Sequence, residues 1–162
     1  MNAIENFQST LRAKSVNRLN IWIEISSLLT EERSNIGQFC LQGVKGIKSE
    51  FYGARKGTDM SHKESDFTEP LFDIPYTNSV IKDLGLHRTR VMILKPKSCL
   101  TYHTDPSWRV HIPLITNEKC FFLENMEARH LEADTVHVVD TTQPHTSINA
   151  SREERVHIVG VI

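Results

Sequence analysis

Hydrophobic positions in the first fifty residues recur mostly at the spacing of amphipathic helices. An apolar segment, residues 19–29, precedes Thr30, which can cap a helix whose first turn holds two glutamates. Apolar residues between 36 and 44 continue the helical spacing, and glycines then end the pattern. The β-branched residues within 21–25 also fit a strand. The pattern therefore predicts a helical N-terminal part, with a strand at 21–25 as the alternative.

Two segments lead from this helical part to the second half of the chain. Residues 52–70 are polar and include two glycines, which indicates a loop. So long a loop in a small domain is either a mobile lid or plain surface. Residues 77–84 predict a short helix, capped by Thr77 or Asn78 and ended by Gly85.

From residue 88 the hydrophobic period changes to two, which is typical of half-buried strands. The predicted strands are 88–94, 99–103, 108–115, 120–123, 129–131, 135–139, 145–148 and 154–162. Short strands at a regular spacing of about 8–12 residues indicate a sandwich or barrel. We therefore expect one domain over 1–162, mainly β. Residues 1–85 form its helical and loop part, and 86–162 form a β core with the helices packed outside.

Composition and charge exclude several classes of protein. Apolar residues make up 39% of the 162 residues, and the net charge of -1 argues against a protein that covers nucleic acid with positive charge. No apolar run approaches the roughly 20 residues of a membrane span, and no signal-peptide pattern is present, so we expect a cytoplasmic protein. The three cysteines, Cys40, Cys99 and Cys120, fit neither a disulfide framework nor a zinc site.

Histidine marks the second half as the place to look for chemistry, because seven of the eight histidines follow residue 85. His103 and Asp105 are two residues apart, so in a strand their side chains point to the same face. One more histidine from another strand, such as His145, completes a set of two histidines and one carboxylate. This set leaves adjacent metal positions open, as in non-haem Fe(II) oxygenases.

Three further polar residues lie at strand spacing among apolar neighbours, namely Arg109, His111 and Arg155. An arginine on an inward face needs an anionic partner, since an unpaired buried charge is costly. Two arginines and a histidine near a metal site suggest a small ligand with two carboxylates. His157 shares the face of Arg155 and either reaches the site or packs in the core. Arg88 and Arg90 either hold an anionic substrate or form a solvated face.

Four segments, taken together, resemble the aspartyl/asparaginyl β-hydroxylase family of Fe(II)- and 2-oxoglutarate-dependent oxygenases. The segments are HTDP (103–106), RVHIPL (109–114), QPH (143–145) and RVHIV (155–159). The resemblance covers roughly residues 88–162. It implies a double-stranded β-helix, or jelly roll, which agrees with the strand pattern. It also implies an enzyme that hydroxylates its substrate while converting 2-oxoglutarate to succinate and carbon dioxide.

The resemblance also implies roles for individual residues. His103, Asp105 and His145 would bind Fe(II), and Arg155 would bind the distal carboxylate of 2-oxoglutarate. Arg109 and His111 match the residues that hold its keto-acid end. The chain departs from the family at Met92, near which the family has a serine for the distal carboxylate. Thr101 can substitute for that serine, or Arg155 acts alone.

The resemblance leaves the substrate open between aspartyl or asparaginyl side chains of proteins and free amino acids. We expect a small amino-acid or peptide substrate and no nucleic-acid or membrane partner. Two alternatives remain. The first is a cupin-like metal-binding protein, or a dioxygenase that does not use 2-oxoglutarate, although neither has a need for Arg155 and Arg109. The second is a binding module with a vestigial site, against which the complete set of three predicted ligands argues.

Overall fold

The computed structural model of the chain describes residues 2–12, 14, 16–54 and 61–162. Its helices are α1 (Ala3–Arg12), α2 (Arg18–Leu28), α3 (Glu31–Ile36) and α4 (Pro75–Asp83), with a 3-10 turn η1 (Glu64–Asp66). None of the helices in the described ranges is long and apolar enough to cross a membrane.

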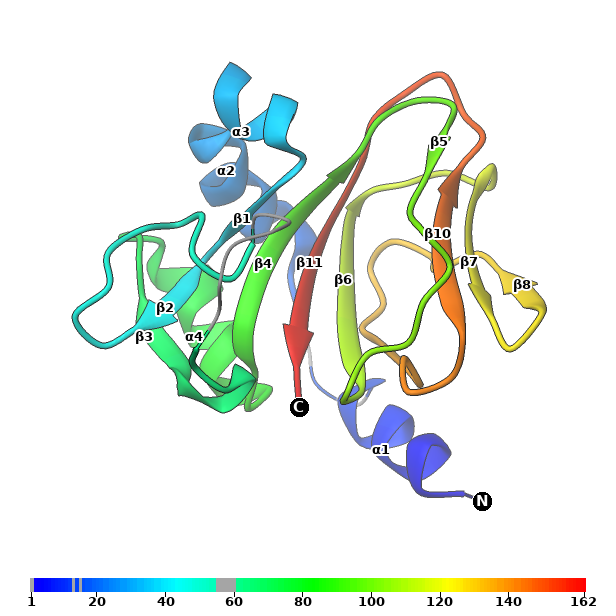
Figure 1. Cartoon of the computed structure of the whole chain (residues 1–162), viewed down its shortest axis with the longest axis horizontal. Coiled ribbons are helices and arrows are strands. Elements are labelled where there is room, and N and C mark those ends of the chain that lie inside the picture. Colours follow the sequence, from blue (N-terminus) through cyan, green and yellow to red (C-terminus); the bar gives the residue numbers. More distant parts are fainter. Residues whose placement is uncertain (1, 13, 15, 55–60) are drawn as a thin grey trace.

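Two antiparallel sheets face each other and form the body of the molecule (Figure 1). In spatial order, the five-stranded sheet contains β1 (Gln38–Cys40), β4 (His87–Leu94), β11 (Arg155–Val161), β6 (Arg109–Ile115) and β9 (His137–Val139). The four-stranded sheet contains β5 (Ser98–Cys99), β10 (His145–Asn149), β7 (Cys120–Glu124) and β8 (Glu127–Arg129). A separate pair joins β2 (Gln42–Val44) to β3 (Phe67–Pro70).

The path of the chain between the two sheets makes the core a jelly roll. From β4 onward the chain passes to the other sheet at β5, returns at β6, crosses again to β7 and β8, and returns at β9. It then crosses to β10 and ends in β11, which lies between β4 and β6. This repeated crossing of antiparallel strands is the double-stranded β-helix. The predicted fold class, a mainly β jelly roll with N-terminal helices outside, is confirmed.

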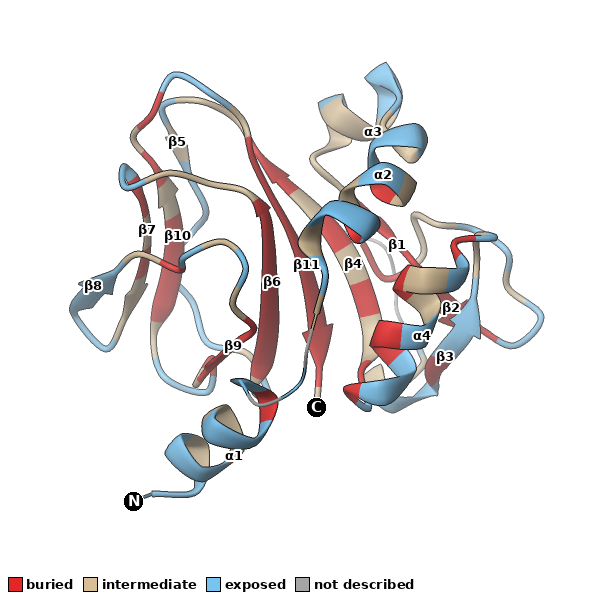
Figure 2. Ribbon diagram, turned by 180° about the vertical axis from the view of Figure 1, so that it is seen from behind, coloured by how far each residue is buried: buried red, intermediate tan, exposed pale blue. Residues whose placement is uncertain are grey.

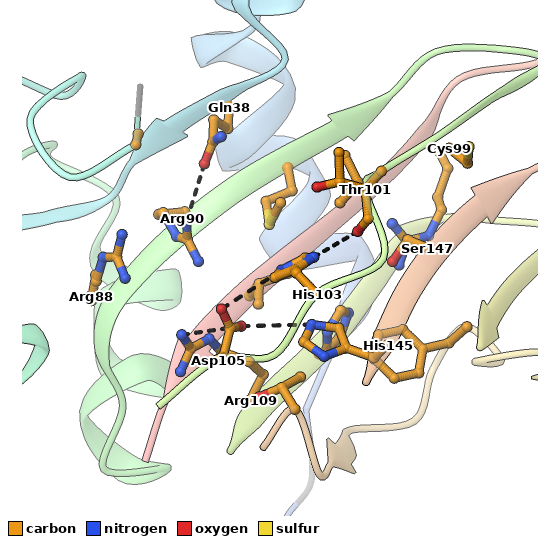
Figure 3. A pocket seen from close by; sticks show the side chains of 18 of the residues that line it. Gln38, Arg88, Arg90, Cys99, Thr101, His103, Asp105, Arg109, His145 and Ser147 are labelled. Atoms are coloured by element: carbon orange, nitrogen blue, oxygen red, sulfur yellow. Dashed lines mark hydrogen bonds and ion pairs between the residues drawn. The ribbon is translucent and has the colours of Figure 1, made fainter. Parts of the chain in front are cut away.

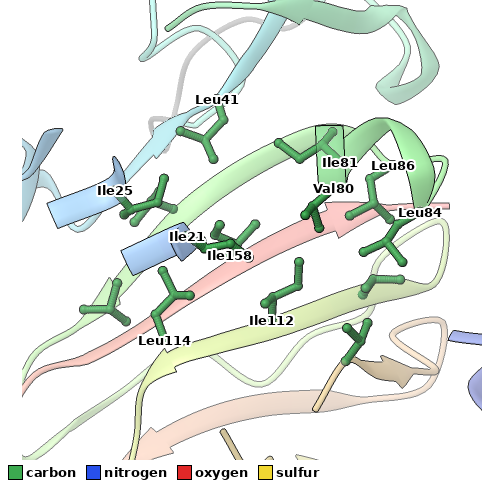
Figure 4. Close-up of a cluster of buried hydrophobic side chains, with 14 of the residues drawn as sticks. Ile21, Ile25, Leu41, Val80, Ile81, Leu84, Leu86, Ile112, Leu114 and Ile158 are labelled. Atoms are coloured by element: carbon green, nitrogen blue, oxygen red, sulfur yellow. The ribbon is translucent and has the colours of Figure 1, made fainter. Parts of the chain in front are cut away.

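The five-stranded sheet has an apolar face and a polar face because its side chains alternate. Val156 and Ile158 of β11 belong to the main hydrophobic cluster. Ile21 and Ile25 of α2, both 0% exposed, pack in the same cluster (Figure 4). The helices α2 and α4 cover this outer face (Figure 2). The alternate residues of the same strands, among them Arg155, face the space between the sheets.

The helix predicted beyond Thr30 is correct at its start and wrong at its end. Thr30 caps α3 as predicted, because its side chain accepts a hydrogen bond from the backbone N–H of Arg33. The helix stops at Ile36, since Gly37 takes a left-handed conformation with φ of 87°. The apolar residues beyond it lie in β1 and β2, where Phe39 pairs with Val91 of β4. The alternative strand at 21–25 is also wrong, because these residues belong to α2.

The helix predicted over 77–84 begins two residues earlier, at Pro75, and neither Thr77 nor Asn78 caps it. The carboxylate of Glu24 in α2 takes the place of a local cap. It accepts hydrogen bonds from the backbone N–H groups of Tyr76 and Thr77 at 3.0 and 2.8 Å, and from the Thr77 hydroxyl at 2.6 Å. A tertiary contact therefore satisfies the first turn of α4 and joins it to α2.

The predicted loop 52–70 is partly regular, since it ends in η1 and β3, while residues 55–60 lie outside the described part of the chain. The lid interpretation of this loop stays a prediction. The strand expected at 99–103 is shorter than predicted, because β5 ends at Cys99 and only His103 makes a further bridge, to His145.

Candidate metal and anion site

The first residue of β10 and the segment that follows β5 bring His145, His103 and Asp105 together between the sheets (Figure 3). His103 and His145 exchange both backbone hydrogen bonds, at 3.1 and 2.8 Å, which fixes the two rings side by side. The backbone N–H of Asp105 donates to Thr141 at 2.7 Å and holds the turn that carries the carboxylate. One possible ligand atom from each of the three side chains lies within 4.8 Å of the others.

The hydrogen bonds of the two imidazoles direct the correct nitrogens toward a metal. Nδ1 of His103 lies 2.6 Å from the carbonyl oxygen of Thr101, and Nδ1 of His145 lies 3.0 Å from that of Gln143. A carbonyl only accepts hydrogen bonds, so both Nδ1 atoms carry the proton and both Nε2 atoms keep a free lone pair. Such outer contacts are what orients histidine ligands in metal sites.

The three donor atoms fit one metal ion. Nε2 of His103 and Nε2 of His145 each lie 3.7 Å from an oxygen of Asp105. Two ligands at right angles, each about 2.1 Å from an ion, are about 3 Å apart, so a small side-chain adjustment closes the site. Two imidazoles and one carboxylate are the donor set of non-haem iron oxygenases. Phe122 stacks against the ring of His145, with centroids 5.7 Å apart, and limits its movement.

Glu64 of η1 is a functional candidate that the sequence analysis missed. Its carboxylate pairs with Arg88 at 2.5 Å and with Arg109 at 2.7 Å, and it accepts a hydrogen bond from Ser107 at 2.6 Å. Arg109, only 2% exposed, also reaches Asp105 at 3.2 Å. Burial alone would raise the pKa of Glu64, but the Ser107 hydroxyl and the two guanidinium charges lower it below its usual value.

Arg155 lies at the inner face of β11, 3% exposed. Its Nη2 donates to Nδ1 of His157 at 2.8 Å, and no carboxylate of the described residues forms an ion pair with it. Two acidic residues of neighbouring strands and turns also bind elsewhere, since Glu124 pairs with Arg129 and Asp140 accepts a hydrogen bond from the backbone N–H of Thr142. Burial lowers the pKa of Arg155 to about 10, which leaves it charged near neutral pH.

His157 and His111 form a buried imidazole pair behind Arg155. Because an arginine only donates, Nδ1 of His157 accepts its hydrogen bond and carries no proton. The 3.2 Å contact between the two Nδ1 atoms therefore requires the proton to lie on His111. Burial, with the nearby Arg155 charge, holds the pKa of both rings well below the usual value, so both are neutral. His157 thus orients Arg155, and the contact of His111 with a keto acid stays a prediction.

All six predicted site residues line one cavity of about 540 Å³ between the sheets. Arg109 and His111 enter the cavity from β6 and Arg155 from β11, both strands of the five-stranded sheet, whereas His145 enters from β10 of the four-stranded sheet. Met92 and Thr101 line the cavity as well, and Ser147 of β10 adds a hydroxyl that the sequence analysis did not single out. Arg88 and Arg90 also line the cavity and do not form a solvated face. The only feature of the sequence that indicated this position is their spacing of two residues, which puts both side chains on one face of a strand.

Several solved structures share part of this fold at low sequence identity. They include a cupin 2 conserved barrel domain protein from Salinispora arenicola (13% identity, 46% of this chain and 61% of that chain, TM-score 0.38). A cupin-like protein from Thermotoga maritima matches with 25% identity over 46% of this chain and 55% of that chain, with a TM-score of 0.40. A salicylate 1,2-dioxygenase from Pseudaminobacter salicylatoxidans matches with 12% identity over 45% of this chain and 21% of that chain, with a TM-score of 0.41. The chain thus spans less than two thirds of each of these proteins.

Comparison with protein families gives a more extensive match. No curated protein matches the sequence significantly. The family described as aspartyl/asparaginyl beta-hydroxylase matches residues 41–160, which begin just after β1 and include β2 and all later strands apart from the last residue of β11. The match therefore extends well before residue 88, where the resemblance was first apparent. On this evidence the chain belongs to the aspartyl/asparaginyl beta-hydroxylase family.

Proposed function

We propose that this protein is an Fe(II)- and 2-oxoglutarate-dependent hydroxylase that acts on an amino acid or on an aspartyl- or asparaginyl-like residue of a peptide. The observation that carries the proposal is Arg155. It is a buried guanidinium in the same cavity as the three candidate ligands, with no carboxylate of the described residues to pair with. A metal-binding protein that takes no anionic cosubstrate has no use for this charge.

The chain's own residues would divide the work as follows. Nε2 of His103, Nε2 of His145 and an oxygen of Asp105 would hold the iron. Arg155, oriented by His157, would bind the distal carboxylate of 2-oxoglutarate through its planar fork. Arg109 would lie near the keto-acid end. When bound, iron and 2-oxoglutarate would supply the oxidising chemistry, and 2-oxoglutarate would leave as succinate and carbon dioxide.

The walls of the cavity would hold the ligand side chains in position and exclude water. Phe122 and the backbone bridge between His103 and His145 keep the two imidazoles in place. Thr101 and Ser147 line the same cavity, and their hydroxyls would be available to a carboxylate in place of the family serine, near whose expected position this chain has Met92. Enclosure between the two sheets strengthens each charged contact made there.

The test is an assay of 2-oxoglutarate turnover on protein purified without oxygen, with added Fe(II) and a library of amino acids and short peptides. His145→Ala should abolish succinate formation and weaken metal binding while the melting temperature stays close to that of the wild type. His130→Ala is the matched control, because its ring bonds to the backbone of Cys120 outside the cavity. Full iron-dependent succinate formation by His145→Ala would refute the proposal. Metal binding without any affinity for 2-oxoglutarate would favour the cupin-like alternative.

A further inference from the structure

The cavity holds more positive charge than its carboxylates neutralise. Four arginines line it, from β4, β6 and β11: Arg88, Arg90, Arg109 and Arg155. Among the described residues, the carboxylates that reach these arginines are Glu64 and Asp105. Glu64 pairs with Arg88 and Arg109, and Asp105 pairs with Arg109. Arg90 and Arg155 are left without a carboxylate partner in the part of the chain that the structure describes.

Arg90 is the charge that the proposed function does not use. Its Nη1 donates to the side-chain oxygen of Gln38 at 3.1 Å, and its buried Nε has no hydrogen-bond partner. Cys40 lies opposite Arg90 in the pairing of β1 with β4, but burial raises the pKa of that thiol to about 11, so it is uncharged at neutral pH. Burial and the neighbouring Arg88 and Arg109 charges lower the pKa of Arg90 to about 10, so it stays charged.

The strand register separates Arg90 from Arg155. Arg90 lies opposite Val159 of β11, whereas Arg155 lies opposite Leu94, four residues further along β4. Four residues of antiparallel strand span about 13 Å. The two guanidiniums therefore enter the cavity at different points along the sheet. Figure 3 shows Arg90 beside Gln38 at the cavity wall next to Arg88, near Asp105 of the metal set.

We propose that Arg90 and Gln38 form a second anion subsite, which binds a carboxylate of the substrate while Arg155 binds the cosubstrate. The inference rests on the proposed function for the role of Arg155. A single unneutralised guanidinium matches a monoanionic carboxylate better than a dianionic phosphate. Because the oxygen of Gln38 faces Arg90, its amide N–H groups are free to donate to the same anion. The carboxylate can be the α-carboxylate of a free amino acid or a side-chain carboxylate of a peptide.

The experiment is a calorimetric titration of protein loaded with Zn(II) and 2-oxoglutarate, so that no turnover occurs. Four probes separate the sources of charge. N-Acetyl-L-asparagine carries only an α-carboxylate, and N-acetyl-L-aspartate α-amide carries only a side-chain carboxylate. N-Acetyl-L-aspartate carries both, and N-acetyl-L-asparagine α-amide carries neither. We expect at least one of the two singly charged probes to bind more tightly than the uncharged one.

Arg90→Gln should weaken binding of that charged probe about ten- to a hundred-fold and leave the uncharged probe unchanged. Arg90→Lys should recover part of the loss, since an ammonium keeps the charge without the fork. The control Arg152→Gln removes an exposed arginine outside the cavity and should have no effect. Removing an unneutralised charge should not lower the melting temperature of Arg90→Gln.

Two results would overturn the subsite, and a third concerns the proposed function alone. The subsite is wrong if no charged probe binds the loaded wild type more tightly than the uncharged probe. It is also wrong if Arg90→Gln binds all four probes as the wild type does. Titration of 2-oxoglutarate itself into the Zn(II)-loaded protein separates the two ideas. Absence of that binding contradicts the proposed function, whereas normal binding with either of the first two results contradicts only the subsite.

Discussion

Glu64→Gln should destabilise the protein by removing one charge from a buried cluster while keeping the side chain's shape. The Glu64 side chain is 13% exposed and that of Arg109 is 3% exposed, and they lie 2.7 Å apart. Removing one partner of a buried ion pair costs about 3–5 kcal/mol, because the other charge stays buried. Arg109 keeps its contact with Asp105 at 3.2 Å, so the lower end of this range, about 3 kcal/mol, applies. For a chain of this size the melting temperature should fall by about 6–12 °C.

The effect should depend on pH in a defined direction. The folded protein lowers the pKa of Glu64, so the carboxylate contributes stability above its unfolded pKa of about 4.3. That contribution is lost as the pH falls through the lower pKa of the folded state. The difference in melting temperature between wild type and Glu64→Gln should therefore be full at pH 7 and shrink below about pH 4.

Thermal unfolding at pH 7 and at pH 3.5, followed by circular dichroism, measures this difference. Glu69→Gln is the control, because Glu69 is exposed on β3, in the same segment as Glu64. A second readout is metal affinity. Without Glu64, Arg109 is free to pair more fully with Asp105 and to compete with the metal, so affinity should fall about 10–100-fold. A fall of less than about 2 °C at pH 7, with unchanged metal affinity, would show that the cluster does not hold the site.

Two further predictions concern Arg155 and Glu24. Arg155→Ala should weaken 2-oxoglutarate binding about ten- to a few hundred-fold in a calorimetric titration, with metal affinity and melting temperature nearly unchanged. A lower melting temperature with unchanged affinity would contradict it, and Arg155→Lys should recover only part of the loss. Glu24→Gln should weaken the capping of α4, cost about 1 kcal/mol and lower the melting temperature by about 2–4 °C. The exposed Glu31→Gln is its control, and an equal loss in both variants would exclude a specific cap.

Local pattern was sufficient for the elements whose side chains alternate between two environments. The strands β4, β6 and β11 could be predicted because one face meets the helices and the other meets the cavity. The strand expected for His103 ends early, at Cys99, but the structure still brings His103 and Asp105 together with His145. The helix expected through residue 44 failed because helical spacing of a few apolar residues also fits short buried strands. Gly37 and the pairing of Phe39 with Val91 decided the outcome.

The parts of the site that sequence reasoning missed depend on contacts between distant segments. Glu64 lies in a polar stretch without periodicity, and it meets Arg109 only through the fold, 45 positions away. The same is true of Glu24, which meets Thr77 53 positions away. Backbone carbonyls, which leave no mark in a sequence, set the proton positions of the metal-site histidines. No pattern along the chain signals any of these contacts.

The alternation within β11 explains how one strand serves both stability and chemistry. Val156 and Ile158 are buried against the helices, so their substitution by smaller residues would open a void in the main cluster and cost stability. Arg155 and His157, their immediate neighbours, are equally buried but face the cavity, where the pair orients a charge instead of filling a volume. Burial alone therefore does not separate structural from functional residues in this sheet. The two groups differ in the chemistry of the face to which they point. The face under the helices carries apolar side chains. The face between the sheets carries two guanidiniums that have no carboxylate partner among the described residues, and it lies beside a complete set of candidate metal ligands.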